Sequence, residues 1–565
     1  MIRIQPRREE FDVAIVGSGA GGGMAAYQLT KAGAKVALLE AGARWFASED
    51  APMFRWSYSS PRRGGATPER PFGEFDACIG GWEVMGEPFT TAPGTRFAWW
   101  RARMLGGRTN HWGRISLRFG PDDFRRKSLD GLGEDWPIGY DDIAPYYDEV
   151  DRLVGIFGSM EGLPNDPDGI FHTPPPPRCY ELLIKRACDD LGVRCIPARL
   201  SILTKMHNGR VPCHYCGQCD RGCITNSNFS SPEVLIRPAM ETGNLTLFLE
   251  AMVREVTVDA RGRATGFTYV DKATGEDRHV RARVVVLAAS AMESARLLLN
   301  SKSAAFPDGL ANGSGTVGKY LTDTTGAGVA GFIPAMTDHV PHNEDGSGGG
   351  HIYMPWWLDN SKLDFPRGYH IEVNGGLGMP SYGFMGGIHR YPPGGGYGAQ
   401  LKEDYRRYYG ASVYLAGRGE MVTNDDCYCE IDDDTVDRWG IPVLRVHWKW
   451  SEHEILQAKH MHETFRSIIA RMGGEVFSDM PTRERDYGLM TGGAIIHELG
   501  GARMGRDPDS SVVNAWCQAH EVDNLFIADG APFVSQADKN PTWTILALSM
   551  RTSDHIADLM RRGAL

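Results

Sequence analysis

The stretch DVAIVGSGAGGGMAAYQL, residues 12–29, decides the fold class. Its apolar start indicates a short buried strand, and a helical pattern covers residues 24–32. Between them, Gly17, Gly19 and Gly22 have the spacing GxGxxG. In such a unit the first glycine makes a tight turn, the second lets the backbone approach a pyrophosphate, and the third lets the helix pack on the strand. The stretch therefore predicts a dinucleotide-binding site at the start of a helix.

A second strand and an acidic residue extend this unit. Residues 35–39 form an apolar run that ends in Glu40, at roughly the 20-residue distance expected for an acid that binds ribose hydroxyls. An apolar run at residues 284–289, followed by a helical pattern at residues 290–299, predicts that the same sheet continues much later in the chain. The nucleotide-binding domain is therefore expected to be discontinuous in sequence. These elements alone leave FAD and NAD both open.

The composition excludes several classes of function. The chain has 565 residues, a formal net charge of −11 and no run rich in lysine or arginine, so a nucleic-acid partner is not expected. No stretch approaches the roughly 20 consecutive apolar residues of a membrane span, so we expect no transmembrane segment of its own. The start of the chain, MIRIQPRREE, contains no apolar signal region, so any export is expected to depend on another protein.

A group of four cysteines has the spacing C-x2-C-x2-C-x3-C. Its members are Cys213, Cys216, Cys219 and Cys223. Thiolates at such short spacings can surround one compact metal core, and the run matches a bacterial ferredoxin pattern except that Ile224 replaces the usual proline. The spacing favours an iron–sulfur cluster, of 4Fe-4S or 3Fe-4S type, held by three or four of these residues. A structural zinc, which more often uses two separated cysteine pairs, and unligated thiols or disulfides are the alternatives.

A series of segments along nearly the full chain resembles the glucose–methanol–choline (GMC) oxidoreductases, FAD flavoproteins that oxidise alcohols. The segments are VGSGAGGGMAAYQL (16–29), LLEAG (38–42), ARMLGGRTNHWG (102–113), AASAMESARLLLNS (288–301), VGKYLTD (317–323), HELGGARMG (497–505), IADGAPF (527–533) and NPTWTILALSMRTSDHI (540–556). The resemblance implies FAD rather than a nicotinamide cofactor. It also implies an α/β fold in which a discontinuous Rossmann-like FAD-binding domain joins an α+β substrate domain built on an antiparallel sheet.

The resemblance also implies a division of the chain into parts. The FAD-binding domain is expected to comprise residues 1–50, 95–156, 225–330 and 490–565. Residues 51–94 are expected to form lid or interface loops, residues 195–224 the iron–sulfur segment, and residues 331–489 the substrate domain. Aromatic residues of this last part suit the apolar faces of sugar rings, although core packing explains any one of them equally well. They include Trp356, Trp357, Tyr382 and Tyr391.

Two residues near the C-terminus match the positions that carry the family's chemistry. His497 corresponds to the catalytic histidine, and Asn540 corresponds to a second position that is His or Asn in members. Hydride transfer from a carbinol carbon requires loss of the hydroxyl proton, which a neutral imidazole accepts at pH 7. We expect His497 to act as general base and the Asn540 amide to hold the substrate oxygen. The alternative is that His497 is only packed or capping.

Further positions match the family's contacts with FAD, with Val253 at the adenine. They are Leu105, Gly106, Gly107, Asn110, Val253, Asp529, Gly530, Pro541 and Thr542. A structural role is the alternative for Asp529. The segment around His111 resembles a sugar-oxidising branch that includes pyranose 2-oxidase, in which the corresponding histidine can be joined covalently to FAD. We expect His111 to lie against the flavin, with a covalent bond, a noncovalent contact and plain packing all open.

Together these features predict an FAD-dependent dehydrogenase for a hydroxyl of a sugar or sugar derivative, of the glycoside 3-dehydrogenase, gluconate or fructose dehydrogenase type. An iron–sulfur cluster gives a one-electron outlet from a flavin, and large subunits of sugar dehydrogenases in this family carry a cysteine motif of different spacing. We therefore expect a small subunit and a cytochrome or quinone-linked electron acceptor as partners. The alternatives are an oxygen-using sugar oxidase of the pyranose-oxidase type and an electron-transfer subunit. Resemblance implies a periplasmic protein co-exported with a signal-bearing small subunit, with a cytoplasmic enzyme as the alternative.

Overall fold

A computed structural model describes most of the chain. The described residues are 10–53, 55–67, 70, 73–74, 76–338, 346–355, 362–377 and 397–565. The aromatic residues expected to face a sugar, Trp356, Trp357, Tyr382 and Tyr391, lie outside these ranges. No helix within the described ranges is both long enough and apolar enough to cross a lipid bilayer.

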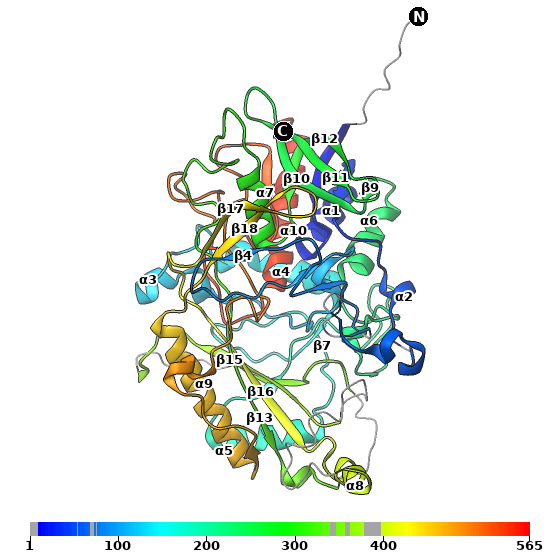
Figure 1. The fold of residues 1–565 in the computed structure, drawn as a ribbon, viewed down its shortest axis with the longest axis vertical. Coiled ribbons are helices and arrows are strands. Elements are labelled where there is room, and N and C mark those ends of the chain that lie inside the picture. Colours follow the sequence, from blue (N-terminus) through cyan, green and yellow to red (C-terminus); the bar gives the residue numbers. More distant parts are fainter. Residues whose placement is uncertain are drawn as a thin grey trace, which may run out of the picture.

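The nucleotide-binding half is built on a seven-stranded sheet with the order β10-β11-β12-β1-β2-β9 and with β20 beside β12. Figure 1 shows β10, β11 and β12 of this sheet together at one end of the molecule. Its strands are β1 (Glu10–Val16), β2 (Val36–Leu39), β9 (Leu245–Phe248), β10 (Ala251–Val258), β11 (Ala264–Asp271), β12 (Glu276–Leu287) and β20 (Leu525–Ile527). β1 lies parallel to β2 and β12, whereas β10, β11 and β12 pair antiparallel. Every residue of β2 is buried, as expected for a parallel strand covered on both faces.

Helix α1 (Ala20–Lys31) begins directly after the glycine turn and packs against the long C-terminal helix α10 (Thr542–Arg561). A Cβ atom at Gly21 would lie 1.8 Å from the carbonyl oxygen of Ala528, so no other residue fits where α1 crosses the end of β20. Helix α10 also contacts α4 (Tyr140–Val154). The predicted strand–helix–strand unit is confirmed, although α1 starts earlier than predicted because its glycines are themselves helical. The predicted later strand and helix are also present, as β12 and α7 (Ala291–Asn300).

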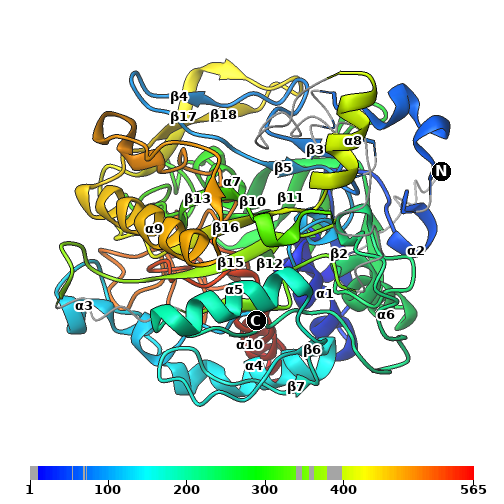
Figure 2. The same ribbon diagram turned by 90° about the horizontal axis from the view of Figure 1, so that it is seen from below.

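The second half is built on a six-stranded antiparallel sheet with the order β19-β13-β16-β15-β14-β8. Its strands are β8 (Ile196–Pro197), β13 (Thr325–Phe332), β14 (Ile352–Met354), β15 (Tyr369–Gly375), β16 (Ser412–Gly419) and β19 (Glu475–Val476). Helices α5 (Cys179–Leu191) and α9 (Glu452–Arg471) lie side by side on one face of this sheet (Figure 2). Alternate residues of β15, among them Ile371 and Val373, point into the apolar core beneath these helices. On the other face of β15, His370 lies near Asp538 and Glu372 contacts Asn540, both of the nucleotide-binding half.

Short elements complete the fold. They are α2 (Ala47–Asp50), α3 (Arg126–Asp130), α6 (Arg237–Glu241), α8 (Ala399–Tyr408), β3 (Gly80–Gly81), β5 (Arg101–Ala102), β6 (Ile156–Phe157) and β7 (Phe171–His172). β17 (Tyr428–Val436) and β18 (Pro442–His447) form a small sheet with β4 (Thr90–Thr91) and pack on α7. The expected substrate domain, residues 331–489, is therefore in contact with the nucleotide-binding half through β17 and β18. Strand β13 begins before residue 330, so it crosses the expected boundary between the two domains.

The glycine turn gives the first testable prediction. Gly17 has φ +91°, and a Cβ atom there would lie 2.2 Å from the carbonyl oxygen of Ala288. We expect Gly17→Ala to distort the turn and to lower the bound flavin content, measured by the visible absorbance of the purified protein. Gly33→Ala is the matched control, because Gly33 has φ +93° but a Cβ there meets nothing within 4 Å. It should lose only about 1–2 kcal/mol of stability from the left-handed backbone, and equal flavin loss in both variants would contradict this account.

Candidate active site

A cavity of about 430 Å³ lies at the carboxyl ends of β1, β2 and β12. This is where open α/β sheets bind their ligands. The walls contain Gly17 and Ala288 after two of these strands, and they also contain His497 and Asn540 from the C-terminal part of the chain. Most of the residues predicted from the sequence lie in the walls: Gly17, Gly19, Glu40, Gly107, His111, Val253, His497, Asp529, Gly530, Asn540, Pro541 and Thr542.

Four predicted residues lie behind the walls and shape them. They are Gly22, Leu105, Gly106 and Asn110. A Cβ atom at Gly22 would lie 1.8 Å from the carbonyl oxygen of Gly17, so Gly22 allows the turn to close. The Asn110 amide donates to the carbonyl oxygens of Leu105, at 2.9 Å, and Gly107, at 3.1 Å. Asn110 therefore holds the loop that forms the cavity wall.

Two glycines leave room for a ligand between two backbone segments. A Cβ atom at Gly19 would meet no protein atom within 4 Å, and a Cβ atom at Gly107 would meet only the Cα of Gly19, at 3.9 Å. Gly19 is also the N-cap of α1, where free N–H groups and the helix dipole favour an anion. Backbone on both sides can therefore approach a pyrophosphate, as a dinucleotide requires.

Glu40 is held at one end of the cavity by groups that the sequence did not indicate. Its Oε1 accepts from the Gly42 N–H at 2.8 Å, and its Oε2 accepts from the Ser18 hydroxyl at 2.5 Å. The same hydroxyl accepts from the Gly106 N–H at 2.8 Å. Burial raises the pKa of Glu40, and the bonds from Ser18 and Gly42 oppose this rise. Ser18 thus joins the acidic residue, the glycine turn and the loop at Gly106.

Asp529 combines a cavity position with a structural role. Its carboxylate accepts from the Ser290 N–H at 3.1 Å, the Ser294 hydroxyl at 2.5 Å and the Ala531 N–H at 2.8 Å. It thereby holds the start of α7 against the loop after β20. Burial raises the pKa of Asp529 to about 6. The predicted functional and structural roles of this residue are compatible.

His497 and Asn540 lie together in the walls. The His497 Nε2 is 3.4 Å from the Asn540 Nδ2, and the His497 Nδ1 is 2.9 Å from the hydroxyl of Thr324. Gln536 donates to that hydroxyl at 2.6 Å, and Asp323 accepts from the His497 backbone N–H at 3.0 Å. Burial, with the positive charge of Arg418, lowers the pKa of His497 to about 3. The imidazole is therefore neutral at pH 7, as a general base must be.

Several residues around this pair were missed by sequence reasoning. Thr324 directly follows the segment VGKYLTD, so its position was a usable signal. Arg108 donates to Glu498 at 2.6 Å and ties the glycine-rich loop to the segment that bears His497. Glu372, on β15, accepts from the Asn540 Nδ2 at 3.2 Å. Its sequence surroundings carry no motif that points to this contact.

Comparison with known families identifies the chain. A family model described as GMC oxidoreductase matches residues 20–324, and a second one with the same description matches residues 423–549. The chain belongs to the GMC oxidoreductase family. Members bind FAD and oxidise CH–OH groups, so this GMC oxidoreductase is an FAD enzyme acting on alcohols or sugars, and the predicted family and fold class are confirmed.

Relatives of this GMC oxidoreductase include dehydrogenases and oxidases. The chain is 30% identical to the 2-methyl-1,2-propanediol dehydrogenase of Mycolicibacterium austroafricanum, over 97% of this chain and 95% of the relative. It is 27% identical to the paromamine 6′-oxidase of Streptomyces fradiae, over 98% of this chain and 92% of the relative. It is 26% identical to the fructose dehydrogenase large subunit of Gluconobacter japonicus, over 98% of each chain. Formate oxidase from Aspergillus oryzae has the same fold, with a TM-score of 0.65 and 15% identity. The match covers 99% of this chain and 100% of the formate oxidase chain.

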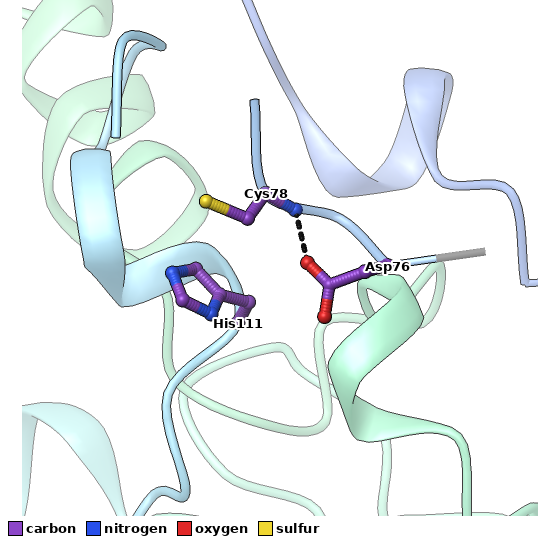
Figure 3. A group of neighbouring side chains, drawn as sticks. All are labelled: Asp76, Cys78 and His111. Carbon is purple, nitrogen blue, oxygen red and sulfur yellow. Dashed lines mark hydrogen bonds between the residues drawn. The ribbon is translucent and has the colours of Figure 1, made fainter. Parts of the chain in front are cut away.

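His111 belongs to a group of three potential metal ligands in this GMC oxidoreductase (Figure 3). One ligand atom from each of Asp76, Cys78 and His111 lies within 4.8 Å of the others. Positive charges act on the group: burial, then Arg114 and Arg108, lower the pKa of His111, whereas burial raises the pKa of Asp76 to about 6 against the charges of Arg70 and Arg114. These positive charges disfavour a bound cation, so we do not assign a metal to this group.

The His111 imidazole is in the cavity wall, as expected for a residue against the flavin. Its Nε2 accepts from the Trp100 indole N–H at 3.3 Å. Burial, followed by the charges of Arg114 and Arg108, lowers the pKa of His111 to about 3, so the ring is neutral. A neutral ring can act as a nucleophile only through its one unprotonated nitrogen, and Trp100 donates to that nitrogen here. The covalent bond to FAD stays a prediction.

Acid precipitation tests that bond. If His111 is joined to FAD, the yellow colour will remain with the precipitated protein, and a His111→Ala variant will release it into the supernatant. Release of all colour from the unmodified protein would contradict the covalent bond and leave a noncovalent contact or plain packing.

The four clustered cysteines form a separate group near the surface. Burial and the neighbouring thiols raise the pKa of Cys213 to about 12, and the same two causes raise the pKa of Cys216. A tetrahedral zinc, with Zn–S distances of about 2.3 Å, would hold its thiolates about 3.8 Å apart. No three of these sulfurs lie within 4.8 Å of one another in the described part of the chain. The iron–sulfur cluster, the zinc and the unligated thiols all stay predictions from the sequence.

The role of His497 can be tested directly. We expect His497→Ala to bind FAD normally but to slow flavin reduction by substrate about 10²- to 10⁴-fold, because the hydroxyl proton loses its acceptor. The rate is measured by anaerobic stopped-flow absorbance. His453→Ala, on helix α9 at the opposite face of the second sheet, is the control and should be unaffected. Full activity of His497→Ala would show that another group is the base.

Proposed function

We propose that this protein is an FAD-dependent dehydrogenase that oxidises a hydroxyl group of a sugar or sugar derivative and passes electrons through an iron–sulfur cluster to a partner protein. The observation that carries the proposal is the position of the cysteine segment. The Ala77 N–H donates to the Asp220 carbonyl oxygen at 2.7 Å, and the adjacent residue Cys78 lies beside His111 in the cavity wall. The cysteine segment therefore contacts the same short loop that backs the flavin cavity.

The alcohol is activated by the neutral imidazole. Bound FAD supplies the hydride acceptor. His497 takes the hydroxyl proton at Nε2, since its Nδ1 is engaged with Thr324. The Asn540 Nδ2 lies beside that nitrogen and donates to the substrate oxygen as negative charge develops on it.

The cysteine segment has features that suit thiolate ligands. Cys213, Cys216, Cys219 and Cys223 would hold the cluster, which would supply a one-electron outlet. The Tyr215 N–H donates to the Cys213 sulfur at 3.3 Å. Burial raises the pKa of Cys219, but the buried guanidinium of Arg114 opposes this rise and stabilises the thiolate. Exposed neighbours such as Val211 and Gly217 leave the segment accessible to a partner.

The relatives support a sugar substrate and a partner subunit. The names of several curated relatives refer to sugars or sugar acids: a fructose dehydrogenase large subunit, a gluconate 2-dehydrogenase flavoprotein and a C-glycoside 3-oxidase. The words "large subunit" support a small subunit here, together with a cytochrome or quinone-linked acceptor. The 2-methyl-1,2-propanediol dehydrogenase extends the range of candidate substrates to small diols.

An anaerobic visible spectrum before and after addition of sugars, glycosides, sugar acids and a 1,2-diol tests the alcohol half of the proposal. Bleaching of the flavin by a sugar-type compound is the expected result. Bleaching by the diol alone would contradict the sugar assignment, and bleaching by dithionite alone would favour an electron-transfer subunit.

Variants of the cysteines test the electron route. We expect Cys216→Ser and Cys219→Ser to lower the iron content and to slow turnover with an artificial one-electron acceptor, while flavin bleaching by substrate is kept. Cys179→Ser, at an exposed cysteine outside the segment, is the control. Iron-free protein that forms one peroxide per product in air would replace the dehydrogenase proposal with an oxidase.

A further inference from the structure

One face of the second sheet carries charged residues toward the proposed catalytic pair. On β15, His370 and Glu372 alternate with the core residues Ile371 and Val373, so both point away from helices α5 and α9. Arg418, on β16, lies directly opposite His370 in the strand register. These side chains therefore meet His497 and Asn540 from the side of the second sheet.

The carboxylate of Glu372 is held by two cationic groups. Its Oε2 accepts from Arg418 at 3.0 Å, and its Oε1 is 3.4 Å from the His370 Nε2. Burial opposes ionisation, but Arg418 and His370 lower the pKa of Glu372 to about 2. Burial likewise opposes protonation of His370, but contacts with Asp538 and Glu372 raise its pKa to about 9. Glu372 is therefore an anion with a fixed position.

An anion next to Asn540 determines which end of the amide faces it. A carboxylate only accepts hydrogen bonds, so the group 3.2 Å from Glu372 must be the amide NH2 and not its oxygen. The second hydrogen of that NH2 is then directed toward the His497 Nε2, 3.4 Å away. The amide oxygen of Asn540 is buried and has no hydrogen-bond partner among the described residues.

The orientation of the Asn540 amide also determines which ring nitrogen of His497 carries the proton. With a donor facing Nε2, the neutral ring must carry its proton on Nδ1, where the Thr324 hydroxyl, at 2.9 Å, can accept it. The free lone pair is then at Nε2, beside the Asn540 donor. If the amide were reversed, its oxygen would face the carboxylate of Glu372 and would also repel a substrate oxygen at Nε2.

We propose that Glu372 is a positioning residue for alcohol oxidation: it orients the Asn540 amide so that the NH2 group, beside His497 Nε2, binds the substrate oxygen. This inference rests on the proposed roles of His497 and Asn540. The inference adds one claim to those roles: the Glu372 carboxylate affects the reaction only through Asn540. A substrate hydroxyl that binds against both nitrogens takes the Asn540 hydrogen away from Nε2, accepts it from Nδ2, and donates its own proton to Nε2.

A double-mutant cycle tests this proposal. Glu372→Gln keeps the shape of the side chain but offers an NH2 group, so Asn540 can take the reversed orientation. We expect about 10- to 100-fold slower flavin reduction, a range typical of groups that orient a reacting side chain. The substrate dissociation constant and the flavin content should change little, because the lost hydrogen bond strengthens mainly in the transition state. In an Asn540→Ala background the same substitution should have almost no further effect.

The Glu420→Gln variant and the Asn540→Ala variant show whether Glu372 acts through Asn540. Glu420→Gln removes another buried carboxylate, one that pairs with Arg126 and Arg367 rather than with Asn540, so it reports general damage to the charged network. If Glu372→Gln slows reduction equally in both backgrounds, Glu372 acts directly on His497 or on folding, and the proposal is overturned while the proposed function stands. If Asn540→Ala itself has no effect on reduction, the assigned role of Asn540 fails, and the proposal fails with it.

Discussion

The cavity depends on two backbone segments that face each other with no side chain between them. The turn at Gly19 and the loop at Gly107 leave this space open, and the helix N-terminus of α1 points into it. Ser18 joins the two segments, since its hydroxyl donates to Glu40 and accepts from the Gly106 N–H. The parts that would hold the two ends of the cofactor are therefore one hydrogen-bonded unit. Arg108 extends this unit to Glu498, next to His497.

The opposite side of the site is built from charges instead of backbone. Leaving one buried charge without a partner is strongly destabilising, so each buried ion needs an opposite charge beside it. Here Glu372 lies between Arg418 and His370, and Lys539 contacts both Asp123 and Asp538. Such an array holds each member in place more firmly than a single surface pair would. The substrate side thus gains rigid polar groups from a sheet whose other face is an ordinary apolar core.

The relatives of this chain differ in what receives the electrons, although they share one fold. Their names include both dehydrogenases and oxidases, so membership of the family does not decide the acceptor. The alcohol half of the reaction needs only a neutral base, an oxygen donor and the flavin. In this chain a cysteine segment contacts the loop at Ala77, next to the cavity. In the proposed function, electron delivery is a property of this local segment and not of the common core.

The sequence by itself determined the βαβ unit and the acidic residue Glu40, because both follow from short spacing, and it predicted the pair His497 and Asn540 through the resemblance of two contiguous segments to the family. It also predicted the antiparallel second sheet through the family resemblance. Only the tertiary structure decided which groups orient these residues. Glu372 lies 168 residues before Asn540 and reaches it because β15 places alternate side chains on the face opposite its core. No local pattern encodes that contact, since it arises from the packing of one sheet against loops of the other half.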